Sequence, residues 1–130
     1  MTAVERNTRC VVGWRVLWQR SEEAFQDMID TSPKAQQYFS DAFPIYSSLV
    51  YYPGKFRVSD GKTDTFSVEG VNAELRHYLA RLVRRSRCFS RCPHALACAI
   101  TLFVYCHNSR QLYKQKYPKY PTHLIDFVSL

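Results

Sequence analysis

One long stretch of this sequence lacks acidic residues. Residues 76–120 hold ten Lys and Arg and no Asp or Glu, whereas residues 1–75 hold eight basic and ten acidic residues, within a formal net charge of +7. A surface that serves only solubility usually mixes both signs. A basic block of this length therefore indicates a polyanionic partner. We expect a nucleic acid rather than a membrane surface, because no clear amphipathic anchor accompanies the block.

The sequence also lacks the marks of membrane and secreted proteins. No uninterrupted apolar run approaches the length of a membrane span, and the first residues form no apolar signal-peptide core. Internal repeats and low-complexity segments are absent as well. With 46% hydrophobic and 15% aromatic residues, the chain can bury a core. Its 130 residues suit one compact domain, which we expect to be cytoplasmic.

The five cysteines do not form an even set, which argues against a disulfide framework. A zinc site is the alternative, since several cysteines and histidines lie close together in the sequence. Their spacing matches no common zinc-ligand pattern. Cys98 and Cys106 lie in an apolar helical run, where cysteine packs as a small hydrophobe, so we predict core packing. The residues of this group are Cys88, Cys92, His94, Cys98, Cys106 and His107.

Local patterns predict alternating strands and helices, which is typical of an α/β domain. Ser21 is a good N-cap for a helix that the Thr31–Pro33 segment ends, and Pro93 suits the first position of another helix. The second of these helices is apolar almost all round, so we expect it to be largely buried. The expected elements are strands at Thr2–Val4, Thr8–Trp18, Gln36–Ser40 and Phe56–Ser59, helices from Ser21, from near Ser67 and from Pro93 to about Leu112, a short helix or loop at Tyr46–Tyr52, and an extended tail at Tyr117–Pro121.

The helix predicted near Ser67 carries a carboxylate and a cation on one face. Glu69 lies in its first turn, and Arg76 follows two turns later. Asp41 directly follows the predicted strand Gln36–Ser40. Carboxylates at a strand end and on a following helix, with a cation behind them, can hold a divalent metal against a phosphate backbone. The spacing alone equally describes an amphipathic helix with a capping acid and a solvated arginine.

Five segments, in order along the chain, resemble one protein family. On them the chain resembles bacterial insertion-sequence transposases of the DDE class, in particular the group named after the first insertion sequence described. The resemblance covers nearly the whole chain. The segments are TRCVVGWRV (Thr8 to Val16), YFSDAFPIY (Tyr38 to Tyr46), the run from Thr63 to Ser90 that includes VEGVNAELRHYLARL, LFVYCHNSRQL (Leu102 to Leu112) and YPKYPTHLIDFV (Tyr117 to Val128).

The resemblance implies a ribonuclease-H-like (retroviral-integrase-like) α/β fold that lacks its first strand and has a C-terminal helical extension. Residues 1–92 would form a partial catalytic domain, and residues 93–130 the C-terminal helix and extended tail of the same domain. The family transposes DNA by cutting and joining strands, with carboxylates that hold Mg²⁺ or Mn²⁺ for phosphoryl transfer. DNA is the partner that the resemblance implies.

Site residues follow from the resemblance position by position. Asp41 matches the second acid of the family's triad and Glu69 matches its glutamate, so both are the expected catalytic and metal-binding residues. Arg76 matches a basic residue that the family places against the DNA backbone. Further phosphate contacts, which position DNA without reading its sequence, are expected from Arg81, Arg84, Arg85, Arg87 and Arg91.

Departures from the family limit what the resemblance implies. The first catalytic aspartate has no counterpart in this sequence, and Glu5 matches a hairpin position rather than a metal ligand. The family's end-recognition regions are unmatched, and Ala97–Ala99 stand where relatives carry arginines. We therefore expect a transposase-like chain that is catalytically incomplete. The alternative is a non-catalytic, DNA-binding regulatory fragment that associates with itself or with a full-length transposase. A third hypothesis is a small basic RNA-binding protein, but the sequence contains no recognisable RNA-binding motif.

Overall fold

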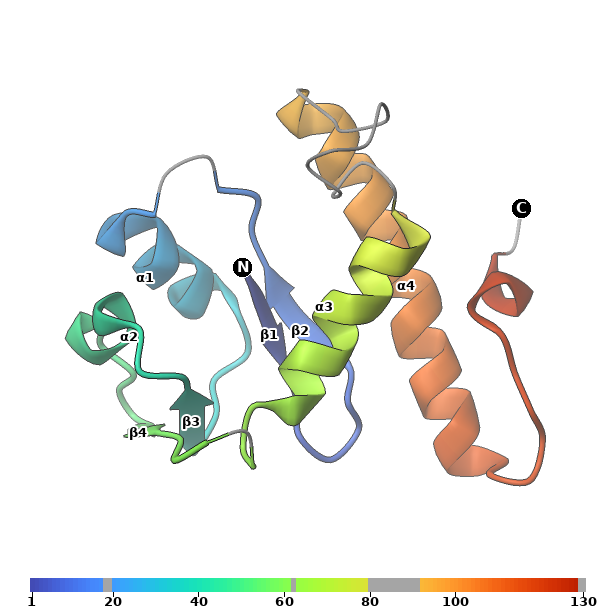
Figure 1. The fold of residues 1–130 in the computed structure, drawn as a ribbon, viewed down its shortest axis with the longest axis horizontal. Coiled ribbons are helices and arrows are strands. Elements are labelled where there is room, and N and C mark those ends of the chain that lie inside the picture. The colour runs from blue at the N-terminus through green and yellow to red at the C-terminus, as the bar shows by residue number, and fades with distance from the viewer. Residues whose placement is uncertain (18–19, 62, 80–91, 129–130) are drawn as a thin grey trace.

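A computed structural model of the chain describes residues 1–17, 20–61, 63–79 and 92–128 (Figure 1). These residues form a mixed α/β arrangement with two small sheets, which confirms the predicted α/β class. In chain order the elements are β1 (Thr2–Val4), β2 (Val11–Trp14), α1 (Glu22–Thr31), β3 (Gln37–Ser40), α2 (Pro44–Ser48), β4 (Lys55–Val58), α3 (Phe66–Tyr78), α4 (Pro93–Lys116) and the 3-10 helix η2 (Leu124–Phe127).

The strands β1 and β2 form an antiparallel hairpin with an irregular register between Ala3 and Val4. Its turn is closed by Glu5, whose carboxylate accepts hydrogen bonds from the backbone N–H groups of Asn7 (3.0 Å) and Thr8 (2.7 Å). A hydrogen bond from the Thr8 hydroxyl, and to a smaller extent these two backbone bonds, lower the pKa of Glu5. Glu5 is therefore a hairpin residue, as predicted. The strand expected over Thr8–Trp18 is shorter in the structure, because β2 spans only Val11–Trp14.

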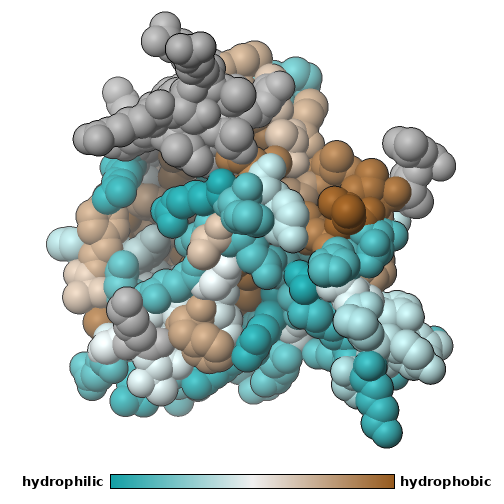
Figure 2. Space-filling view, turned by 45° about the vertical axis from the view of Figure 1, so that its right-hand side comes forward, coloured by the Kyte–Doolittle hydropathy of each residue, from teal (hydrophilic) through white to brown (hydrophobic). Residues whose placement is uncertain are grey.

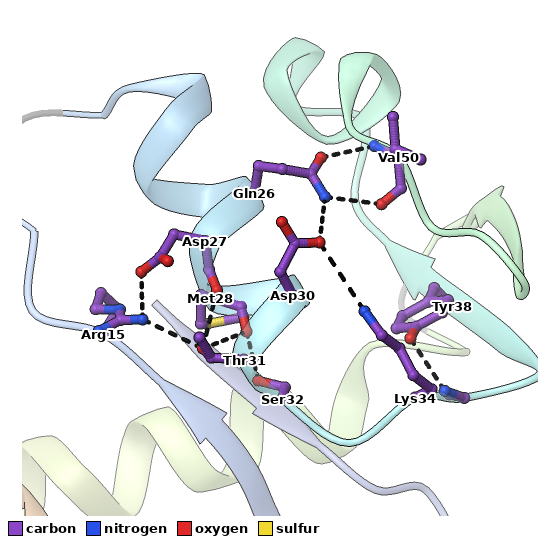
Figure 3. A network of polar contacts seen from close by, with 11 residues as sticks. Arg15, Gln26, Asp27, Met28, Asp30, Thr31, Ser32, Lys34, Tyr38 and Val50 are labelled. Atoms are coloured by element: carbon purple, nitrogen blue, oxygen red, sulfur yellow. Dashed lines mark hydrogen bonds and ion pairs between the residues drawn. The ribbon is translucent and has the colours of Figure 1, made fainter.

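The helix α1 begins where the sequence predicts. The Ser21 hydroxyl accepts a hydrogen bond from the backbone N–H of Ala24 at 3.2 Å, and two glutamates occupy the first turn. Gln26 of α1 pairs with the backbone of Val50: its side-chain oxygen accepts from the Val50 N–H at 2.8 Å, and its side-chain nitrogen donates to the Val50 carbonyl at 2.9 Å (Figure 3). This pairing fixes α1 to the segment that follows α2. The residues that α1 buries are Phe25, Met28 and Ile29.

The strands β3 and β4 pair in parallel and form a second, separate two-stranded sheet. Tyr51 stacks on Phe56 of β4 with ring centroids 4.5 Å apart, and its hydroxyl donates to the Tyr46 carbonyl at 2.7 Å. Burial, with smaller contributions from neighbouring tyrosines, raises the pKa of Tyr51 to about 12. This aromatic cluster joins the parallel pair to α1 and α2 in one core.

The helices α3 and α4 share a second core with the hairpin and η2 (Figure 1). The helix α4 runs four residues beyond the predicted end at Leu112. The expectation that it is largely buried is wrong, because Leu102 and Tyr105 are 54% and 57% exposed. Among the described residues, the side of α4 that packs in the core is the opposite one. The residues of this core are Val11, Val71, Leu75, Leu96, Ile100, Phe103, Cys106 and Leu124.

The extended tail predicted over Tyr117–Pro121 is wrong, because the chain turns directly after α4: the backbone N–H of Tyr120 donates to the Tyr117 carbonyl at 3.2 Å. The chain then forms η2, which the sequence did not predict. The backbone N–H of His123 donates to the Asp126 carboxylate at 2.8 Å and caps this short helix. Leu124 is buried in the core beside α4. Within the part of the chain that the structure describes, no helix has the length and apolar character needed to cross a membrane.

Candidate functional site

The candidate site lies where the parallel strands end. Because β3 and β4 run in the same direction, their carboxyl ends meet at one edge, where the backbone N–H of Ser59 donates to the Ser40 carbonyl at 2.8 Å. Asp41 directly follows β3 at this edge. The chain leaves β4 through a short loop into α3, whose first turn carries Glu69. Asp41 therefore follows a strand end and Glu69 begins the helix after the next strand, as the sequence predicts, whereas the parallel pairing of the two strands was not predicted.

Asp41 is exposed, and one of its carboxylate oxygens is engaged in the turn before α2. Its Oδ1 accepts a hydrogen bond from the backbone N–H of Phe43 at 3.1 Å. The pKa of Tyr46 in α2 is raised mainly by burial and secondly by the negative charge of Asp41. Asp41 thus lies against α2, where an Asx turn orients the chain that enters the helix.

Glu69 and Arg76 are exposed at opposite ends of α3. The Thr65 hydroxyl lies 3.4 Å from Glu69 Oε1, in the first turn. An acid in the first turn and a base in the last turn both stabilise a helix through its dipole. Each residue therefore has a helix-stabilising role that is independent of metal or DNA.

A further carboxylate at this edge, Asp64, was not identified from the sequence. Its Oδ1 lies 3.1 Å from the guanidinium of Arg6, and its Oδ2 accepts from the Ser59 hydroxyl at 3.3 Å. The Arg6 guanidinium also lies over the ring of Phe39 in β3, 5.2 Å from its centroid. Asp64 therefore ties the hairpin to the β4–α3 loop. No sequence signal could have paired it with a residue 58 positions away.

Metal binding requires several ligands at one point. Among residues 1–17, 20–61, 63–79 and 92–128, no three His, Cys, Asp or Glu side chains lie together as a group that could hold a metal ion. The family's chemistry uses three carboxylates for two divalent cations. Asp41 and Glu69 do not fit that complete set in the described structure, so no catalytic step is assigned to them.

The cysteines take different environments in the structure. Cys106 is buried in the core at 1% exposure, and burial raises the pKa of its thiol, so it packs as predicted. Cys98 is instead exposed on α4, with its sulfur 3.8 Å from Nε2 of His94. Core packing is therefore wrong for Cys98, because its side chain is exposed. Cys88 lies outside the described residues.

A buried polar cluster joins α3, α4 and the hairpin turn. His107 is 1% exposed, with Nδ1 3.1 Å from Oε2 of Glu74 and Nε2 3.0 Å from the backbone carbonyl of Arg9. The guanidinium of Arg110 approaches the other Glu74 oxygen at 3.7 Å. Beside it, Asn108 receives a hydrogen bond from the Val11 N–H (2.7 Å) and donates one to the Val11 carbonyl (2.9 Å).

This cluster holds the fold together rather than meeting a substrate, because His107 is closed off from solvent. Arg9 has a φ of 59°, so its carbonyl points to His107 from a left-handed backbone conformation. The signal that could have found the cluster is a polar residue inside the apolar run of α4, together with Glu74 beside the buried Leu75 of α3. A buried polar group in such a run needs a partner.

The predicted DNA contacts lie only partly within the described structure. Arg76 is exposed, as DNA contact requires. Arg110, also in the basic block, is instead engaged with Glu74. Lys114, Lys116 and Lys119 are exposed at and beyond the end of α4. The other predicted contacts lie outside the described residues, so for them the prediction stands as made from the sequence: Arg81, Arg84, Arg85, Arg87 and Arg91.

Comparisons with known proteins give no match that could identify this chain. No family model matches it, no curated protein sequence matches it, and no solved structure matches it. The transposase resemblance therefore stays a prediction, based on the sequence segments described above.

Proposed function

We propose that this chain is a DNA-binding protein of the DDE-transposase type, with a ribonuclease-H-like fold and an incomplete metal centre. The observation that carries the proposal is the position of the two matched acids. Asp41 directly follows β3 of a parallel pair, and Glu69 lies in the first turn of the helix that follows β4. Carboxylates at a strand end and on a following helix can bind Mg²⁺ or Mn²⁺ beside a phosphate backbone.

The order of elements supports the proposed fold. An antiparallel hairpin is followed by α1, by the parallel pair β3–β4 and by α3. The two strand pairs form separate sheets. A ribonuclease-H-like sheet without its first strand, as the resemblance implies, accounts for this separation.

The charge distribution supports DNA as the partner. The acid-free block from residue 76 to 120 holds ten basic residues. The acidic residues after β4 and in α3 all lie before this block in the sequence. Phosphate contacts by Lys and Arg release counterions, so binding through them is salt-dependent and largely independent of base sequence. We expect weak, non-specific DNA binding of this kind.

Fluorescence anisotropy with a labelled DNA duplex tests the DNA partner. Arg76→Ala and the double variant Arg84→Ala/Arg85→Ala should weaken binding severalfold, because each removes a proposed phosphate contact. Lys34→Ala is the matched control, since Lys34 is exposed outside the block and pairs only weakly with Asp30 at 3.9 Å. Equal affinities for wild type, Arg76→Ala and Lys34→Ala would reject Arg76 as a DNA contact.

A strand-transfer assay tests the incomplete metal centre. It also distinguishes a catalytically incomplete transposase chain from a regulatory fragment that acts on a full-length transposase. With two matched carboxylates, the chain alone should show no Mg²⁺- or Mn²⁺-dependent cleavage or joining of DNA. The regulatory alternative predicts that added chain inhibits a full-length transposase. Metal-dependent joining by wild type that is lost in Asp41→Ala or Glu69→Ala would refute incompleteness.

A further inference from the structure

The helix α4 has a second apolar stripe that faces solvent. Leu102, Tyr105 and Leu112 are 54%, 57% and 54% exposed. With Cys98 and Ser109 they recur at intervals of four, three, four and three residues. A repeat averaging 3.5 residues is the spacing of a helix–helix seam. Large exposed side chains in this pattern indicate a surface that pairs with another helix.

The stripe is not the core-facing side of α4. At 100° per residue, it lies on the opposite side of the helix from Leu96, Ile100, Phe103 and His107, which are all buried. The core therefore uses one side of α4 and leaves the other apolar side without a partner among the described residues. A helix that is apolar all round is normally buried all round.

The 3-10 helix η2 widens this apolar surface. The ring of Phe127 lies 5.7 Å from the ring of Tyr113 on α4, so η2 borders the stripe. Two further residues of this terminal segment, Ile125 and Val128, are 69% and 42% exposed. Figure 2, in which the side of α4 and η2 comes forward, shows strongly hydrophobic surface gathered there. The stripe and the exposed side chains of η2 together form what we call the α4 face.

We propose that the α4 face binds the α4 face of a second copy of this chain, with the two α4 helices antiparallel. A two-fold axis at Tyr105 brings Leu112 opposite Cys98 of the second copy. It brings Leu102 close to Ser109 of the second copy, with an offset along the helix axis of about one residue, or 1.5 Å. Tyr105 then meets Tyr105 of the second copy at the axis, and on either side of it large side chains face small ones, which lets the layers interdigitate. The same surface patch serves both copies, as a two-fold dimer requires.

Charge favours the antiparallel orientation. Between Cys98 and Leu112 the seam contains no charged residue; Lys116 lies beyond one end and His94 beyond the other. A parallel pair would place Lys116 beside its own copy, where like charges repel. The antiparallel pair places it beside His94 of the second copy. Salt should therefore leave the dimer unchanged or strengthen it.

The area of the α4 face sets the expected affinity. Half-exposed leucine and tyrosine side chains, with Ile125 and Val128, offer roughly 500 Å² per copy. The two copies together would bury about 1,000 Å², which is the lower limit for a specific interface. We expect a weak dimer that forms at roughly tens of micromolar chain.

Sedimentation equilibrium over about 5 to 300 µM chain tests the dimer at the concentrations where such an interface is half-occupied. Wild type should shift from monomer to dimer, and Leu102→Asp and Tyr105→Asp should remain monomers. Gln115→Asp is the control, because Gln115 is exposed on α4 away from the stripe and carries the same change of charge. Circular dichroism verifies that each variant is folded. A monomeric wild type, or equal dimerisation of Leu102→Asp and Gln115→Asp, would overturn the proposal.

Oxidative cross-linking tests the orientation. In Leu112→Cys, the new thiol should form an intermolecular disulfide with native Cys98, identified by peptide mass mapping. A Cys98–Cys98 link between wild-type chains at the same oxidant would indicate parallel helices and contradict the register. This proposal is independent of the DNA-binding function, since the dimer should tolerate salt that dissociates DNA.

Discussion

The buried cluster around His107 predicts a large loss of stability on Glu74→Ala. His107 is 1% exposed, and its Nδ1 has Glu74 as its partner at 3.1 Å. The substitution leaves that nitrogen without a partner at a site that water does not reach. It also removes the acceptor near Arg110, whose Nε is already buried without a hydrogen bond.

The magnitude follows from what each contact contributes. Leaving a buried hydrogen-bonding group unpaired costs about 1–3 kcal/mol. The ion pair with Arg110 adds little, because it is 3.7 Å long and the Glu74 side chain is 36% exposed, where solvent screens the charges. We expect Glu74→Ala to lower the free energy of unfolding by about 2 kcal/mol.

Urea denaturation followed by circular dichroism measures this loss. Glu74→Gln is the matched variant, because its amide oxygen can still accept a hydrogen bond from His107; it should lose less than about 1 kcal/mol. A double-mutant cycle of Glu74→Ala with His107→Ala should give a coupling energy of about 1 kcal/mol or more. Equal stabilities of Glu74→Ala and wild type, or additive effects in the cycle, would refute the role assigned to this pair.

Three further substitutions test local features of the fold. Gly70→Ala should stabilise the chain by about 0.5–1 kcal/mol in thermal unfolding, because Gly70 is helical and an added Cβ meets nothing within 4 Å; destabilisation would contradict this. Thr8→Val should raise the lowered pKa of Glu5 toward its ordinary 4.5 in an NMR titration, and should reduce the stability that Glu5 contributes above pH 4.5 and loses as pH falls through its lowered pKa. The pKa of Tyr51 is raised from 10.0 to about 12, so this group should contribute stability that is complete below pH 10 and lost as the pH rises toward 12. Tyr51→Phe should remove the loss of stability that ionisation of Tyr51 causes between pH 10 and 12. An unchanged alkaline unfolding curve in this variant would contradict the assignment.

Local signals in the sequence were enough to place several elements. Ser21 and the glutamates after it begin α1, and Pro93 begins α4, because caps and first-turn residues act within a few positions of the chain. The strand ends were less well predicted: β2 stops at Trp14, although apolar residues continue to Trp18. Pairing partners decide where a strand ends, and one sequence does not show them.

Long-range contacts account for what the sequence could not show. His107 finds Glu74 at a separation of 33 residues, and Asn108 finds Val11 at 97. The burial of α4 was overestimated for the same reason, since hydropathy reports which residues could be buried but not whether another element covers them. Asp41 was expected at a strand end and Glu69 at the start of a following helix, and both are found there. The parallel pairing of the two strands depends on tertiary structure, as does any assembly of these acids with further ligands.

The salt dependence of DNA binding tests the central claim most directly. Anisotropy titrations of a labelled duplex, repeated across a series of salt concentrations, give the slope of log K against log salt. If the basic block contacts about four to six phosphates, the slope should be roughly −4 to −5, and it should become shallower by about 1 in Arg76→Ala but not in Lys34→Ala. Binding that barely changes with salt, or no binding at low salt, would contradict the proposal that this chain binds DNA through residues 76–120.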